Sequence, residues 1–303
     1  MTLKGQNLRI YTYEGGDEYR VVAKSTNCTI TLTGNSEDAS HKDIVGMAAV
    51  PTIVSKGWSV QVESLDVTDV ASMLAAIKSF TPFTLRWDES STTDNQTEVG
   101  AAFARTGQAY LNDVVFQWND RTNSTKQLQF TGSGPLTKVT GTPVTEVIPA
   151  SMAFTKGQFV RLFLSNNNTD TPSRVVAAAR QLSLHISVSL ETVTTKDTEG
   201  DWLVQEPTEL NYDITSNALV RSGDTITSQV GAQTVAEIED IFEAALPVQW
   251  MIANVSGANQ RTKGATIVSG SVIVTSLVAN GPNRQSADYT TTLTGIGDYV
   301  VAE

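Results

Sequence analysis

The chain has 303 residues, 40% hydrophobic and 17% charged, with 21 Lys and Arg against 32 Asp and Glu and a formal charge of −11. Disordered chains show the reverse balance, so this chain should fold, and its length suggests about two domains. The acidic excess argues against a clamp for nucleic-acid phosphates. A lone cysteine, Cys28, excludes an intramolecular disulfide, and two histidines leave little material for metal or general-base chemistry. The composition therefore argues against an ordinary enzyme.

The sequence carries no visible export or membrane signal. Residues 1–7 lack the long apolar run of a signal peptide. Nowhere do about 18 apolar residues run together, as a membrane-spanning helix requires. We therefore expect a protein that is soluble where it is made.

Alternation of apolar and polar residues predicts half-buried strands along most of the chain. Threonine and serine fill the polar phase, which suits a solvated sheet face. The predicted strands are 8–13, 28–33, 58–63, 182–188 and 272–274.

Two segments have helical spacing instead. In 66–80, the apolar residues Val70, Met73, Leu74 and Ile77 form one stripe; Asp66 or Thr68 can cap its start, and Pro82 follows its end.

The second predicted helix spans 234–246, with the stripe Val235, Ile238, Phe242 and Ala245. Thr234 and Glu237 form a capping-box pattern at its start, and Pro247 ends it. Each helix has one apolar face and should lie on a sheet.

Short motifs of the first half recur in the same order in the second half. The matches are 4–6 with 156–158, 21–23 with 175–177, 42–43 with 196–197, Pro82 with Pro247, and 131–134 with 294–297, at offsets of 152, 154, 154, 165 and 163. The drift falls in loop-like segments. We infer a duplication, with domains at 1–145 and 150–303 joined near 141–151, a Pro- and Thr-containing stretch.

The repeated unit resembles the major tail tube proteins of long-tailed bacteriophages. In that family a strand leads to a Thr-x-Lys-Asp-like turn, a long loop, a Trp-containing strand, a helix, and hairpins that end in Gly-x-Gly. The segments that carry the resemblance are 42–43, 44–56, 58–62, 67–80 and 130–134 in the first half, and 194–197, Trp202, 234–246 and 293–297 in the second. Two departures are visible. Most family members have one such domain per chain, and 211–214 replaces the Trp58 strand in the second half.

The resemblance implies a mainly β fold of two tandem tail-tube-like β-sandwich or barrel domains, each with one α-helix packed on its sheet. It implies a non-enzymatic virion protein without cofactors, assembled in the host cytoplasm, whose stacked rings form the DNA conduit of a phage tail. Six domains per ring would make the ring a trimer with pseudo-sixfold symmetry; a hexamer with an outer decorating domain is the alternative. Genomic DNA would pass without specific binding, because an acidic subunit repels phosphate. Further partners would be the tape-measure and terminator proteins.

The segment 44–56 is too apolar for the free surface of a monomer. We expect its apolar residues, together with Trp202, to form inter-subunit contacts; the alternative is a hairpin buried within the same domain. The residues are Val45, Met47, Val50, Ile53, Val54 and Trp202.

Other functions and sites remain open as alternatives. A tail terminator, a hub or an injection-system tube component would share the fold. A two-domain carbohydrate-binding or adhesin β-sandwich would need exposed, clustered aromatics, whereas the five tryptophans are scattered along strands. His185 is expected to be a solvated strand residue, His41 a turn residue, Cys28 a small buried hydrophobe, and the acidic segment 88–95 a polar loop.

Overall fold

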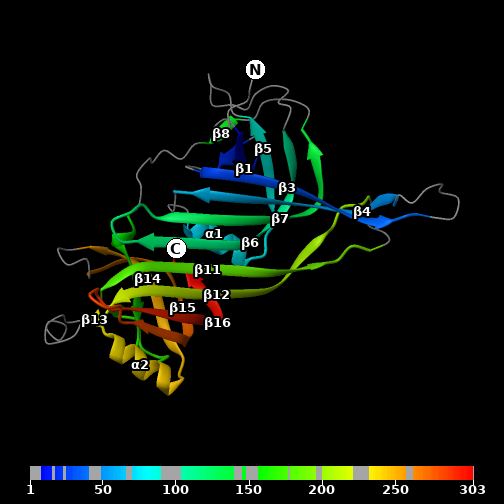
Figure 1. Cartoon of the computed structure of the whole chain (residues 1–303). Helices are drawn as coiled ribbons and strands as arrows, with labels where there is room; N and C mark the ends of the chain where they lie inside the picture. Colours follow the sequence, from blue (N-terminus) through cyan, green and yellow to red (C-terminus); the bar gives the residue numbers. More distant parts are fainter. Residues whose placement is uncertain are drawn as a thin grey trace.

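The computed structural model describes residues 8–15, 18–22, 25–40, 49–65, 70–89, 104–139, 145–147, 156–176, 178–195, 200–220, 232–256 and 262–302. The predicted mainly β fold is confirmed, with two helices (Figure 1). The first half contains β1 (Leu8–Gly15), β2 (Glu18–Val21), β3 (Ser25–Asp38), β4 (Pro51–Ser64), α1 (Val70–Lys78), β5 (Phe83–Glu89), β6 (Arg105–Asn119), β7 (Thr125–Lys138) and β8 (Thr145–Val147).

The second half begins with a 3-10 turn at Gly157–Phe159. It continues with β9 (Val160–Leu164), β10 (Arg174–Val176), β11 (Ala179–Thr192), β12 (Gln205–Leu219), β13 (Ala232–Gln233), α2 (Val235–Ala244), β14 (Val248–Ser256), β15 (Thr262–Asn280) and β16 (Asp288–Val301). All five predicted strands fall within strands, and both predicted helices are present.

The two halves pair their strands in the same spatial order. In the first half the order is β3-β4-β7-β6-β5-β1-β2-β8, and in the second it is β11-β12-β16-β15-β14-β9-β10-β13. The last pair in each half, β2 with β8 and β10 with β13, is parallel, and the others are antiparallel. The one difference in chain order is that β8 follows β7 whereas β13 precedes α2.

The strand registers reproduce the offsets of the sequence motifs. Ile10 pairs with Trp87 in the first half. Leu162 lies 152 residues after Ile10, and it pairs with Ile252, which lies 165 residues after Trp87. β-Bulges occur at equivalent places too. The ladder shifts between Leu111 and Asp113 on β6, and between Val274 and Ser276 on β15. Because one extra residue changes the face of every later side chain, matching bulges keep the same residues on the same face in both halves.

One strand pair joins the halves into a single 16-stranded sheet. The first part of β6 pairs with β5, through Arg105 to Ala109. The rest of the same edge, from Asp113 to Asn119, pairs antiparallel with β11 of the second half. Figure 1 shows β6 and β11 side by side where the two halves meet.

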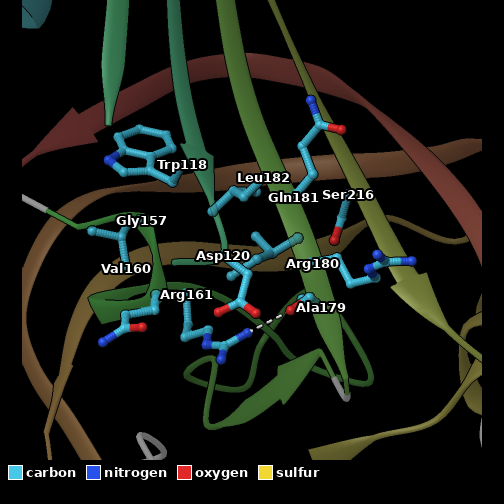
Figure 2. Close-up of a pocket in the computed structure, with 12 residues that line it drawn as sticks. Trp118, Asp120, Gly157, Val160, Arg161, Ala179, Arg180, Gln181, Leu182 and Ser216 are labelled. Carbon is cyan, nitrogen blue, oxygen red and sulfur yellow. Dashed lines mark hydrogen bonds between the residues drawn. The ribbon is translucent and has the colours of Figure 1, made fainter. Parts of the chain in front are cut away.

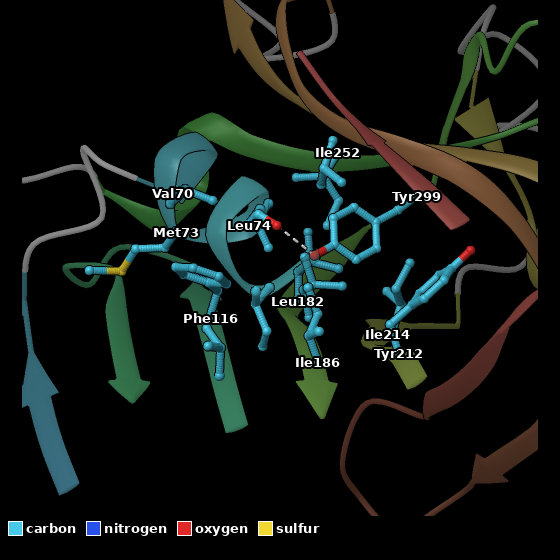
Figure 3. Close-up of a cluster of buried hydrophobic side chains, with 14 of the residues drawn as sticks. Val70, Met73, Leu74, Phe116, Leu182, Ile186, Tyr212, Ile214, Ile252 and Tyr299 are labelled. Atoms are coloured by element: carbon cyan, nitrogen blue, oxygen red, sulfur yellow. Dashed lines mark hydrogen bonds between the residues drawn. The ribbon is translucent and has the colours of Figure 1, made fainter. Parts of the chain in front are cut away.

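Helix α1 packs between the halves. Its predicted stripe, Val70, Met73, Leu74 and Ile77, is buried. Tyr299 on β16 donates its hydroxyl proton to the carbonyl oxygen of Leu74 at 2.7 Å (Figure 3). Lys78 Nζ donates to the carbonyl oxygen of Tyr299 at 2.8 Å. The helix therefore links its own sheet to the second half.

Helix α2 has the predicted capping box, in which Thr234 and Glu237 bond each other's backbone amides. Its predicted stripe is wrong in part: Ile238 is buried as expected, but Phe242 is 42% exposed, and Ile241, which was not in the stripe, is buried instead. The equivalent residue on α1, Ile77, is 2% exposed. The physical reason is that α1 lies against β15 and β16 of the other half, whereas α2 contacts β15 of its own half.

One aromatic side chain in each half covers two glycines of the adjoining strands. Trp58 lies on Gly107 and Gly132, and a Cβ atom built at Gly132 would lie 2.1 Å from Trp58 Cε2. In the second half Tyr212 lies on Gly270 and Gly295, where a built Cβ would lie 2.4 Å from its ring. The Trp58 strand is therefore remodelled in the second half by replacing one aromatic with another at the same place.

Candidate functional site

The middle of the sheet has one buried and one solvated face, as strand alternation predicts. The inward residues pack into a core that includes both helices. The outward residues of β4, β7, β6, β11, β12 and β16 are half-buried or exposed, and we call them the outer face. They are Ser59, Gln61, Glu63, Gln127, Gln129, Thr131, Asp113, Val115, Gln117, Ser183, His185, Ser187, Asn211, Asp213, Thr215, Asn217, Thr290, Thr292 and Thr294.

The outer face is continuous across the junction of the halves, because residues paired in adjacent antiparallel strands point to the same side. It contains no lysine or arginine, and its ionisable residues are three acids and one histidine. Lys126 on β7 points into the core instead and is 1% exposed. The face therefore offers hydroxyl, amide and carboxylate groups and no fixed positive charge.

His185 on β11 bridges the halves at the centre of the outer face. Its Nε2 lies 2.8 Å from Asp113 Oδ2 on β6, and its Nδ1 lies 3.2 Å from Asp213 Oδ2 on β12. Partial burial lowers the pKa of His185, but the hydrogen bond to Asp113 and the charges of both aspartates outweigh it, so the net pKa is raised. A protonated imidazole can donate to both carboxylates, whereas a neutral one can donate to one.

The predicted solvated histidine is thus solvent-facing but bound on both sides. Sequence reasoning missed the two aspartates, since they come from different strands and no local spacing connects them to His185.

The structure describes four of the six residues predicted to form inter-subunit contacts. Val45 and Met47 lie outside the described residues. Val50, Ile53 and Val54 are 39%, 53% and 44% exposed, and the last two belong to β4, which begins at Pro51. That part of the expected loop is therefore strand, since proline is tolerated as a first strand residue.

Trp202 lies against the other half of the same chain. It forms a parallel bridge with Lys56 on β4, and Leu203 N donates to the carbonyl oxygen of Lys56 at 2.8 Å. The ion pair between Lys56 Nζ and Asp201, at 2.9 Å, reinforces this contact. A loop of the second half thus holds the β4 strand of the first.

Other singled-out residues are structural. Cys28 is half-buried and free, and burial raises the pKa of its thiol. The acidic segment 88–95 begins with Asp88, which is fully buried and bonded to Arg86 on the same strand at 2.7 Å, contrary to the expected polar loop at this position. His41 lies outside the described residues, which hold no cluster of three or more potential metal ligands.

The junction also encloses a small hollow of about 10 Å³, room for one water molecule (Figure 2). Trp118, Arg161 and Ala179 line it, and Arg161 donates to the carbonyl oxygen of Ala179 at 2.9 Å. Gly157 closes one side, where a built Cβ would lie 2.3 Å from the carbonyl oxygen of Asn119. The hollow is a seam between packed elements and has no room for a substrate.

Three solved structures resemble part of the chain. The tail of an empty gene transfer agent particle is 14% identical, covers 49% of this chain and 99% of its own, and gives a TM-score of 0.37. The native gene transfer agent virion has the same identity and coverage, with a TM-score of 0.35. The SPP1 tail tube is 14% identical, covers 46% of this chain and 75% of its own, and gives 0.33.

No curated protein matches the chain. No helix within the described ranges has the length and apolar content needed to cross a membrane. Residues 156–301 match the family model described as phage tail tube protein.

Proposed function

We propose that this chain is a structural subunit of a phage tail tube and that its outer face lines the DNA channel. The observation that carries the proposal is the continuous outer face, which spans both halves and contains no lysine or arginine. A lumen that lets DNA slide must not bind phosphate, and binding strength grows with each cation that contacts the backbone. The acidic groups Glu63, Asp113 and Asp213 add repulsion.

We also propose that the chain is a duplication of one tube domain, at 1–145 and 150–303. The shared strand order, registers and bulges support it. β8 (Thr145–Val147) pairs with β2, so the stretch expected to be a linker contributes a strand to the first half. Two tube domains per chain favour a ring of three chains with pseudo-sixfold symmetry, and the rings stack into a tube in the virion.

The exposed residues Val50, Ile53 and Val54 support a contact surface toward another chain or ring, as proposed for the whole segment. Tape-measure and terminator proteins are further partners under the same proposal. A terminator or hub role differs in one observable way: it requires rings that do not stack. An adhesin role has less support, because Trp58, Trp87, Trp118 and Trp250 are buried.

Electron microscopy of the purified protein over a range of concentrations tests the assignment. Stacked rings with a central channel are the expected result. Single rings at every concentration would favour a terminator or hub, and a dispersed monomer would contradict the proposal.

The channel lining is tested by charge. Gln129→Lys and Thr215→Lys place one cation on each half of the outer face. We expect tubes of this variant to co-sediment with short DNA at low salt, whereas wild-type tubes do not. The matched control is Ala236→Lys with Ala244→Lys, two exposed positions on α2, which packs on the opposite, buried face of the sheet. Equal DNA binding by the control variant, or none by the double variant, would contradict the placement of the lumen.

A further inference from the structure

Two strand edges of the sheet lack the partner that their counterparts have. Among the described residues, β3 pairs only with β4, whereas its counterpart β11 pairs with both β12 and β6. Within the described part of the chain, the edge of β15 that faces β14 is paired as far as Val272, and 273–280 has no partner there. The counterpart segment of β6 pairs with β11. β15 is the counterpart of β6, and β3 is the counterpart of β11. The two free edges therefore correspond to the two strands that form the junction within the chain.

Burial differs between the free edges and the formed junction in the direction that a missing partner predicts. On β3, Leu32 is 62% exposed, while its counterpart Ile186 on β11 is fully buried. Ala279 on β15 is exposed, while its counterpart Phe116 on β6 is fully buried.

Helix α2 shows the same asymmetry through Phe242, which is exposed where Ile77 of α1 is buried against the neighbouring half. Helix α1 is held by Tyr299 of the second half, and the counterpart of Tyr299 in the first half is Leu136 on β7. If the first half of a second copy packed against α2 in the same way, the surface around Leu136 would cover Phe242.

The middle of the β3 edge, from Cys28 to Gly34, has no proline, no charged side chain and no β-bulge, the features that commonly protect an edge strand from pairing. A long edge strand of this kind is a template for pairing with another chain. Together these observations indicate that a second copy of this chain covers the two free edges.

We propose that β3 of one chain pairs with the free edge of β15 of a second copy and repeats the junction between β6 and β11. The inference rests on the proposed function, since it specifies how the ring closes. Within the chain His185 stands opposite Val115, and Ser187 opposite Asp113. The equivalent inter-chain register puts Thr31 opposite Val278 and Thr33 opposite Ser276.

Repetition of one junction head to tail gives a closed ring only if its rotation closes. The junction between the halves and the junction between chains are equivalent in this arrangement, so each chain contributes two of the ring's units. A ring of six units then contains three chains, and the outer face runs around the lumen without interruption.

Cysteine cross-linking tests the register in the full-length protein. In a Cys28→Ser background, the pairs Thr31→Cys with Val278→Cys and Ile30→Cys with Ala279→Cys place thiols directly opposite each other. Hydrogen-bonded and non-hydrogen-bonded pairs alternate along an antiparallel ladder, so one of the two pairs has the closer spacing that a disulfide needs. After oxidation with diamide we expect a denaturing gel to show covalent dimers and trimers, and no larger product.

The matched control is Thr31→Cys with Ser276→Cys, which is displaced by two residues on the same face and should cross-link at least tenfold less. Equal cross-linking of the control pair, or a ladder that continues beyond three chains, would overturn the register or the closure. Tubes that form without cross-linking of either test pair would overturn this inference and leave the proposed function standing. Failure to form rings or tubes at all would count against both.

A second variant separates assembly from folding. Leu32→Lys adds a charge on the free edge of β3, at a position that is exposed in the single chain and whose counterpart Ile186 is fully buried, so we expect the chain to keep its melting temperature and to lose rings. The control is Val300→Lys on β16. Val300 and its counterpart Thr137 are both exposed, so the junction within the chain covers neither position. Rings that survive Leu32→Lys would contradict the edge pairing.

Discussion

Replacement of Gly132 by alanine should destabilise the first half through Trp58. The new Cβ would lie 2.1 Å from Trp58 Cε2 and 2.3 Å from Cδ2 and Nε1. Carbon atoms in contact normally stay about 3.5–4.0 Å apart, so the indole must move by more than about 1 Å. The ring is 3% exposed and its Nε1 donates to the carbonyl oxygen of Gly134 at 3.0 Å, so movement disturbs both packing and a hydrogen bond.

The expected loss follows from these contributions. Overpacking costs about 1–3 kcal/mol and a weakened hydrogen bond about 0.5–1.5 kcal/mol. Removal of a strand glycine offsets about 0.5–1 kcal/mol through backbone entropy. The net loss in the free energy of unfolding is therefore about 2–3 kcal/mol, or roughly 4–12 °C in melting temperature.

Thermal and denaturant unfolding of the dilute protein measures this loss. The control is Gly34→Ala, where the nearest atom to a built Cβ is 3.7 Å away, and no loss is expected. In a Trp58→Ala background, the space left by the indole should accommodate the methyl group, so Gly132→Ala should then cost less by about 1–2 kcal/mol. Additive effects of the two substitutions, within about 0.5 kcal/mol, would refute the assigned clash.

Three further substitutions test other contacts. The pKa of His185 is raised in the folded chain, so the stabilisation of the fold by the protonated imidazole is present at pH values below the ordinary pKa and is lost as the pH rises through the folded value. The melting temperatures of wild type and His185→Gln should therefore differ at pH 5 and converge by about pH 9. A difference that stays constant with pH would contradict this. Thr234→Ala removes the α2 cap and should cost about 1 kcal/mol in denaturant unfolding, whereas Thr234→Ser should cost little. Asp88→Asn removes the carboxylate from the buried ion pair with Arg86 and should cost about 3–5 kcal/mol, while a loss below about 1 kcal/mol would show that the pair is dispensable.

The periodic elements could be predicted from the sequence because burial on one face leaves a local record. Strand alternation located β3, β4 and β11, and the stripe of α1 matched its buried side. The Thr234 capping box set the start of α2, since a cap depends on residues three apart. Even the offsets between repeated motifs reappear as strand registers.

The contacts between the halves could not be predicted in the same way. The pairing of His185 with Asp113 and Asp213 depends on a junction between distant strands, for which local periodicity carries no signal. Phe242 fits the apolar stripe of α2 but lies exposed in the single chain. In the proposed ring another copy covers this side chain, so the sequence pattern of α2 agrees better with the proposed ring than with the isolated chain.

Under the proposed duplication, fusion of two tube domains changes what a ring must assemble. A ring of six separate domains depends on six intermolecular strand junctions, whereas three fused chains make half of them intramolecular, at a high effective concentration. The β6–β11 junction then forms with the fold and holds a shared helix, the Tyr299–Leu74 hydrogen bond and the Trp202 loop in place. Lesions at that junction should therefore reduce the stability of the chain itself. Lesions at the β3 and β15 edges should leave the chain folded and act only on assembly, which is why equivalent positions in the two halves are expected to differ in phenotype.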